Sequence, residues 1–97
     1  MCAATTGGLT LEGLDATREA VVQGVVSRDG EPVAGAYVRL LDGSGEFVAE
    51  VPTSATGGFR FFAAPGTWTL RALAPGATAE RRVTAALGQV AEVDLAL

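Results

Sequence analysis

The stretch GFRFFAAPGTWTLRAL, residues 58–73, holds two runs of alternating residues on either side of a Pro65-Gly66 pair. Aromatic residues flank an arginine before the pair, and Trp68 and Leu70 alternate with threonines after it. Alternation with a period of two is typical of a half-buried β-strand, and a Pro-Gly pair is typical of a turn. The stretch therefore predicts a β-hairpin whose large aromatic side chains share one face.

The same alternation recurs along most of the chain. Further strands are predicted over residues 20–26, 36–41, 47–51, 78–84 and 90–97, and short turns rich in Gly and Pro join them. Together with the hairpin they predict an all-β fold, a seven-stranded antiparallel β-sandwich, with the more polar strand 78–84 at an edge. Trp68 is expected at the centre of the core, surrounded by Phe47, Phe59, Phe61, Leu70, Val22, Val26, Val38, Val93 and Leu95.

The chain divides into two parts of different character. Residues 1–18 are small and polar with broken alternation, which predicts a flexible N-terminal segment, with Leu9, Leu11 and Leu14 laid against the sandwich. Residues 19–97 form the predicted β-sandwich domain.

Composition excludes several classes of function. The chain of 97 residues has no His, and all of its seven basic residues are Arg, against eleven acidic residues and a net charge of −4. Without His the commonest general base and the commonest zinc ligand are missing, so we expect no metal site, no cofactor and no self-sufficient enzyme. Dispersed arginines on an acidic chain do not form a nucleic-acid surface, and no long apolar run predicts a membrane span.

Cys2 is the only cysteine and the only candidate nucleophile. A single cysteine forms no internal disulfide, and the N-terminus lacks the basic start and apolar core of a signal peptide, so we expect a cytoplasmic protein. If Met1 is removed, the α-ammonium group and the thiol belong to the same residue, which favours the reactive thiolate. The alternative is a terminal residue without a role, and chelation of a metal by the amine and thiol is a weaker possibility because two ligands are too few.

Two outward-facing sets of residues are further candidates. Arg39, Arg60 and Arg71 have the outward parity of their strands and predict either an anion-binding or partner-binding patch or a set of cross-strand pairs with Glu46 and Glu50. Tyr37, Val48 and Phe62 also have outward parity, together with Leu41, Val21 and Val25. This apolar area predicts an interface, either with a second copy in a homo-oligomer or with another protein.

Two stretches resemble the carboxypeptidase-regulatory-like domains, which have a transthyretin-like (prealbumin-like) sandwich. They are VQGVV with the following Asp29-Gly30 and PVAGA, and TGGFRF with the following APGTWTL. This resemblance covers about residues 20–97 and implies the fold but no activity.

A closer resemblance covers nearly the whole chain. The chain is similar to an actinobacterial SseC-like family of unknown function at Met1-Cys2 and in the segments 37–42, 46–51 and 59–64. That family is associated with sulfur metabolism and is found beside a rhodanese-type thiosulfate sulfurtransferase.

The resemblance implies an accessory or sulfur-carrier protein. Cys2 would accept sulfane sulfur from the sulfurtransferase. The alternative is a non-catalytic structural or interaction module in which Cys2 has no role.

Overall fold

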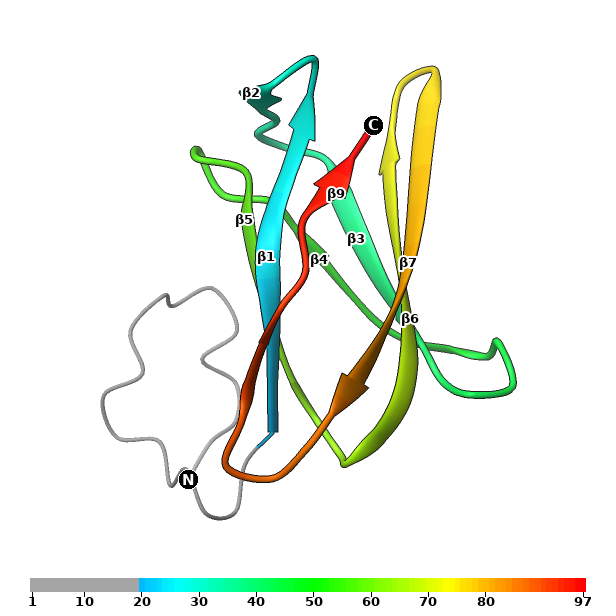
Figure 1. Ribbon diagram of the computed structural model, residues 1–97. Helices are drawn as coiled ribbons and strands as arrows, with labels where there is room; N and C mark the ends of the chain where they lie inside the picture. The colour runs from blue at the N-terminus through cyan, green and yellow to red at the C-terminus, as the bar shows by residue number, and fades with distance from the viewer. Residues whose placement is uncertain (1–19) are drawn as a thin grey trace.

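The computed structural model describes residues 20–97, and its regular structure in this range is all β (Figure 1). The strands are β1 (Ala20–Arg28), β2 (Glu31–Pro32), β3 (Tyr37–Leu41), β4 (Phe47–Pro52), β5 (Gly58–Ala63), β6 (Gly66–Ala74), β7 (Ala77–Ala85), β8 (Val90–Glu92) and β9 (Leu95–Ala96). No helix that could span a membrane is found among these residues. The predictions for residues 1–18, including those for Leu9, Leu11 and Leu14, concern a part of the chain outside the described residues.

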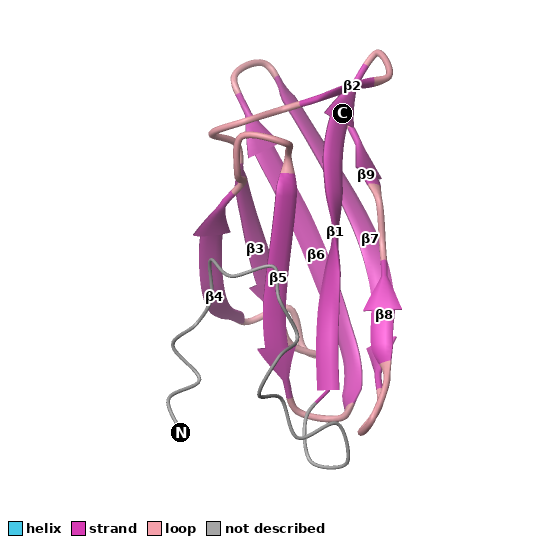
Figure 2. Ribbon diagram, turned by 90° about the vertical axis from the view of Figure 1, so that its left-hand side faces the viewer, coloured by secondary structure: helices cyan, strands magenta, loops and turns pink. Residues whose placement is uncertain are grey.

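The strands form two sheets that pack as a sandwich, which confirms the predicted fold class (Figure 2). In the five-stranded sheet β1 is central: β5 and β2 pair with it in antiparallel fashion, and β8 and β9 pair with it in parallel fashion. The four-stranded sheet has the order β4-β3-β6-β7. The strand β7 is therefore an edge strand, as its polar sequence predicts.

The C-terminal segment differs from the single antiparallel strand predicted over 90–97. It is split into β8 and β9, which run parallel to β1 because the chain crosses from the other sheet after β7. Between them the amide of Val93 donates to the carbonyl oxygen of Gln23 at 2.8 Å. Gly24 makes this approach possible, since a Cβ atom there would lie 1.7 Å from the carbonyl oxygen of Val93. With the two-residue β2, residues 20–97 form nine strands rather than the predicted seven.

The predicted hairpin over residues 58–73 is wrong in its pairing, although both strands exist. β5 pairs with β1 in one sheet, and β6 pairs with β3 and β7 in the other, so the Ala64-Pro65 link crosses between the sheets. A hairpin and a crossover both place alternate residues towards the core, so alternation alone does not separate them. True hairpins occur at β3–β4 and at β6–β7, where the chain turns through Pro75 and Gly76.

The core lies between the sheets and is made by the inward-facing residues of both. Its most completely buried large side chains are Leu70, Leu95, Val22, Val26 and Val38. Phe59 and Phe61 are buried beside them, with ring centroids 6.2 Å apart. Val93 also belongs to this cluster, so eight of the expected core residues are confirmed. Trp68 and Phe47 are the two exceptions.

Phe47 is 59% exposed because β4 contains a β-bulge. The strand pairs Leu40 with Ala49 but Leu41 with Phe47, which leaves Val48 as the extra residue. One inserted residue reverses which face of the sheet the following side chains occupy. Phe47 therefore lies on the outer face, where the Arg39 guanidinium carbon is 5.7 Å from the centre of its ring.

Candidate functional site

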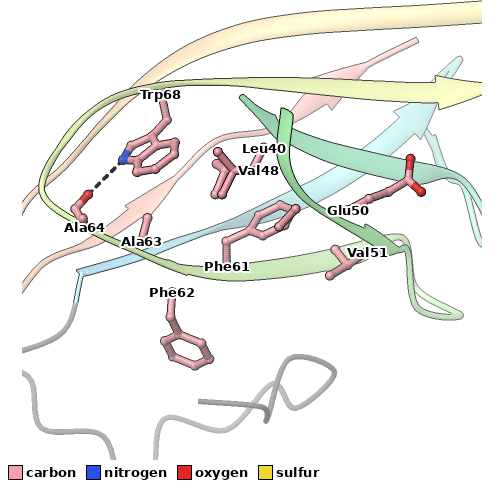
Figure 3. Close-up of a pocket in the computed structure, with 10 residues that line it drawn as sticks. Leu40, Val48, Glu50, Val51, Phe61, Phe62, Ala63, Ala64 and Trp68 are labelled. Carbon is pink, nitrogen blue, oxygen red and sulfur yellow. Dashed lines mark hydrogen bonds between the residues drawn. The ribbon is translucent and has the colours of Figure 1, made fainter. Parts of the chain in front are cut away.

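The strands β4 and β5 are neighbouring edges of the two sheets (Figure 2). An apolar groove opens between them. Its volume is about 370 Å³. One wall comes from β4 and the other from β5, and the crossing from β5 to β6 closes one end (Figure 3). The lining residues are Leu40, Val48, Ala49, Glu50, Val51, Phe61, Phe62, Ala63, Ala64 and Trp68.

Trp68 forms the closed end of this groove and does not plug the centre of the core, so the prediction for it was wrong. It lies near the start of β6 and is only partly buried. Its indole Nε1 donates a hydrogen bond of 2.8 Å to the carbonyl oxygen of Ala64, which Figure 3 shows. A partly buried indole whose only donor is already used is well suited to an apolar contact.

The groove offers binding but no chemistry of its own. Its side chains are aliphatic or aromatic except for Glu50, whose carboxylate at the rim accepts a hydrogen bond of 2.8 Å from Arg39 Nε. Among residues 20–97 no group of three or more His, Cys, Asp or Glu side chains is placed to hold a metal ion. An apolar cleft with little polar lining fits an apolar side chain or ligand better than an anion.

The three candidate arginines are not brought together. Arg39 and Arg71 are cross-strand neighbours on the outer face of the four-stranded sheet. Arg39 pairs with Glu50, and Arg71 Nε donates to Glu80 at 2.6 Å. The row across β4, β3, β6 and β7 therefore has an acid at each end and the two arginines between them. Cross-strand pairing therefore describes these two arginines, with Glu80 in place of the expected Glu46.

Arg60 lies on the other sheet. Its Nε donates to Gln23 Oε1 at 2.8 Å, and Gln23 Nε2 donates to Glu92 Oε2 at 2.6 Å. These three residues form a row across β5, β1 and β8 on the outer face. Arg60 is only 5% exposed, whereas the other two arginine side chains are about two-fifths exposed.

The outward apolar residues also divide between the two sheets, so they form no single row. Tyr37 and Val48 are half exposed on β3 and β4, whereas Phe62 is partly buried on β5. Val48 and Phe62 both line the groove, but the Phe62 ring points away to the other side of β5 (Figure 3). Leu41 and Val21, which have the same outward parity, are buried.

Asp42 is the described residue whose ionisation the fold perturbs most clearly. The amide of Glu46 donates to Asp42 Oδ1 at 3.0 Å, and the amide and hydroxyl of Ser44 donate to the same oxygen. These hydrogen bonds hold the pKa of Asp42 below its usual 3.8, and the one from the Glu46 amide has the largest effect. The role of this carboxylate is to close the turn between β3 and β4.

Cys2, the candidate sulfur acceptor, lies outside the described residues. Sequence reasoning missed the groove. Its walls come from two strands, and the alternation of residues does not show which strands are neighbours. The available signal was the pair of small residues Ala63-Ala64 four to five positions before Trp68, which leaves space beside the indole. No sequence signal marked the burial of Arg60.

Comparison with known proteins assigns the sequence to a family. The sequence profile of DUF1416, a family of proteins of unknown function, matches residues 2–97. The chain belongs to this family. The match includes Cys2 and every strand of the sandwich.

Several relatives in the family are mycobacterial. Two uncharacterised proteins of Mycobacterium tuberculosis strain H37Rv are each 52% identical over 97 residues, which covers 98% of this chain and 97% of theirs. An uncharacterised protein of Mycolicibacterium smegmatis is 54% identical over 84 residues, which covers 86% of this chain and 93% of the relative.

Solved structures share the fold at low sequence identity. A DUF3823 family protein from Parabacteroides merdae has a TM-score of 0.62 and 16% identity over 82% of this chain and 46% of its own. The dioxygenase domain of a dioxygenase carbohydrate-binding protein fusion from Streptomyces sp. SirexAA-E has a TM-score of 0.62 and 15% identity, over 87% of this chain and 83% of that domain. Likeness at this level shows the fold alone.

Proposed function

We propose that this protein is an accessory protein of sulfur metabolism that accepts sulfane sulfur on Cys2 from a rhodanese-type thiosulfate sulfurtransferase. The observation that carries the proposal is the sequence: Cys2 is the only cysteine in a chain without His, and it lies inside the family match. The resemblance to the SseC-like family supplies the connection to sulfur transfer.

The transfer step balances without an added oxidant or reductant. The Cys2 thiolate attacks the terminal sulfur of the sulfurtransferase persulfide, a new S–S bond forms on Cys2, and the sulfurtransferase cysteine leaves as a thiolate. This chemistry needs a thiol that stays reduced, which is why we place the protein in the cytoplasm.

The composition of the β-sandwich supports separate roles for the sandwich and the N-terminal segment. Residues 20–97 contain neither Cys nor His, and the groove between β4 and β5 has no reactive group. In this proposal the sandwich binds the partner and the N-terminal cysteine carries the sulfur. The protein then needs no metal or cofactor for the step.

A second candidate is a non-catalytic interaction module in which Cys2 has no role. It is favoured by the groove and by the exposed apolar residues beside it, Val48 and Phe47, with Tyr37 on the same outer face. Aromatic residues and arginine are the residue types that dominate binding energy at protein interfaces. Both candidate functions therefore use the same surface, and they differ in whether Cys2 has a role.

Intact-mass measurement after incubation with thiosulfate and the sulfurtransferase tests the first candidate. We expect the chain to gain the mass of one sulfur atom, the gain to disappear after reduction, and the Cys2→Ser variant to remain unmodified. If the wild-type chain gains no sulfur while it still binds the sulfurtransferase, the interaction module is the correct description.

A further inference from the structure

The strand β7 has a sheet edge that is long and regular. It is the last strand of the four-stranded sheet, and within residues 20–97 only β6 pairs with it, over nine residues without a register shift. The opposite edge strand of that sheet, β4, contains the bulge at Val48 and ends at Pro52, which has no N–H group. Bulges and prolines hinder the pairing of a sheet edge with another chain, and β7 has neither.

The hairpin with β6 determines which backbone groups of β7 point to this edge. Pro75 and Gly76 form a two-residue turn, and the pair that closes such a turn, Ala74 with Ala77, is hydrogen-bonded. Successive residues of a strand direct their N–H and C=O groups to alternate sides, so the odd-numbered residues of β7 face β6. The residues whose backbone groups point to the free edge are therefore Thr78, Glu80, Arg82 and Thr84.

The side chains of these four residues lie on the outer face of the sheet and are exposed. They alternate with residues of β7 that pack on the core, such as Val83 and Ala85. Glu80 pairs with Arg71 on the outer face, whereas Arg82 makes no hydrogen bond or ion pair within residues 20–97. The edge thus carries one acid and one base, with a threonine beyond each of them.

We propose that two copies of this chain pair through β7, edge to edge and antiparallel, about a twofold axis at Arg81. In this register Glu80 of one copy lies opposite Arg82 of the other, and the same pair forms again across the axis. Thr78 and Thr84 match in the same way, so every residue that points its backbone to the edge has a partner.

The neighbouring registers are less favourable. A shift of the axis by one residue in either direction places Glu80 opposite Glu80, or Arg82 opposite Arg82, and leaves backbone groups at one end unpaired. The register with the most hydrogen bonds is therefore also the one in which opposite charges meet. Because the strand is complementary to itself in this way, a second copy is the partner that fits the edge.

The pairing extends the row of charges on the outer face. Glu80 then lies between Arg71 of its own chain and Arg82 of the second copy, so the arginine without a partner gains one. Arg81 faces its own copy at the axis, but its side chain is exposed, so solvent and salt screen this repulsion. The two four-stranded sheets become one sheet of eight strands.

This inference does not depend on the role of Cys2, and it leaves the groove open. The groove lies beside β4, at the other end of the four-stranded sheet from β7 (Figure 2). Each copy in the dimer therefore keeps its own groove. Substitutions at Glu80 and Arg82 test the dimer without changing the groove lining.

Complementary charge reversals in the full-length chain test the pairing. In sedimentation experiments the wild-type mass should rise from one chain to two as the protein concentration increases. Arg82→Glu places carboxylates opposite each other and Glu80→Arg places guanidinium groups opposite each other, so each variant alone should remain a monomer. An equimolar mixture of the two variants should form a one-to-one dimer, because every acid again meets a base.

A matched variant and a backbone measurement make the result specific. Glu46→Arg reverses a charge near the opposite edge of the sheet and should leave the dimer unchanged. In the wild-type chain the amides of Glu80 and Arg82 should exchange with solvent more slowly as the protein concentration rises, whereas the amide of Glu50 on β4 should not respond.

Three results would overturn the proposal. The first is a wild-type chain that stays a monomer up to about 1 mM. The second is a dimer that survives both single reversals or leaves the exchange of the Glu80 and Arg82 amides unchanged, which assigns the dimer to another surface. The third is a mixture of the two folded variants that stays monomeric.

Discussion

Individual residues fix the places where backbone segments pass close to one another. Gly24 lies against the carbonyl of Val93. Gly57 adopts a φ of 79°, and a Cβ atom there would lie only 2.7 Å from the carbonyl oxygen of Val26. Gly43, in contrast, could carry a Cβ atom, which would make only an ordinary van der Waals contact of 3.8 Å with the carbonyl oxygen of Thr67. Glycine is therefore required at positions 24 and 57 and replaceable at position 43.

Replacing Gly24 with alanine should separate β1 from the chain between β8 and β9. We expect Gly24→Ala to lower the free energy of unfolding by about 3 kcal/mol or more, because the backbone must move to admit the methyl group. Gly43→Ala is the control and should change it by less than about 1 kcal/mol. Chemical denaturation measures both, and equal effects of the two substitutions would contradict the close approach.

Thr53 connects the turn before β3 to the end of β4. Its hydroxyl donates to the carbonyl oxygen of Val33 at 2.7 Å and accepts from the amide of Ala36 at 3.0 Å, and the residue is 7% exposed. Thr53→Val should lower the free energy of unfolding by about 1–3 kcal/mol, since two buried backbone groups lose their partner. Thr53→Ser keeps the hydroxyl and should cost clearly less; a valine variant as stable as the serine variant would refute this role.

Asp42 gives the turn between β3 and β4 a dependence on pH. Because its pKa is lowered in the folded state, its carboxylate contributes stability above the ordinary value of 3.8, and the contribution is lost as the pH falls through the lower, folded pKa. An NMR titration of the Asp42 carboxyl should show a midpoint below 3.8, with the amides of Ser44 and Glu46 moving at the same pH. A midpoint at or above that value would exclude these hydrogen bonds in solution.

At the scale of strands, sequence predicted where the strands lie far better than which strands pair. Alternation located β1, β3, β4, β5 and β6, because burial of one face leaves a period of two. It did not show that β5 and β6 belong to different sheets, since a Pro-Gly link permits a hairpin or a crossover. Neither did it show the bulge at Val48, which depends on how β4 meets β3.

The bulge leads to a prediction that separates Phe47 from Phe59, two residues that the sequence predicted in the core. Phe47→Ala should change the free energy of unfolding by no more than about 0.5 kcal/mol, because the ring is on the surface. Phe59→Ala should cost about 3–5 kcal/mol, because Phe59 is in the core. If denaturation experiments show comparable losses of stability for the two variants, then Phe47 lies in the core and β4 has no bulge.

At the scale of the whole molecule, the sandwich of residues 20–97 is a scaffold that carries an apolar groove. The groove between β4 and β5 and the exposed Val48 beside it provide an apolar contact surface, while Cys2 provides the reactive group in our proposal. Sequence identified Cys2 because it is the only cysteine. It could not identify the groove, because a groove between sheet edges is a property of how two sheets are aligned.

The groove can be tested separately from the cysteine. Val48→Asp places a charge on an apolar wall, whereas Glu46→Asp is a nearby change outside the groove lining. If the sulfurtransferase docks there, sedimentation or calorimetry should show at least about a tenfold weaker affinity for Val48→Asp, equivalent to roughly 1.4 kcal/mol, and unchanged affinity for Glu46→Asp. Equal affinities of the two variants for the sulfurtransferase would show that it docks on another surface.

Sulfite release from thiosulfate tests the central claim most directly. The sulfurtransferase is supplied with thiosulfate and with this protein as the sole sulfur acceptor, and one sulfite is released for each sulfur that reaches a thiol. Our account predicts sulfite in stoichiometric amount to the wild-type chain and none above background with Cys2→Ser. Equal sulfite release with the two chains, or none with either, would contradict the assignment of Cys2 as the acceptor.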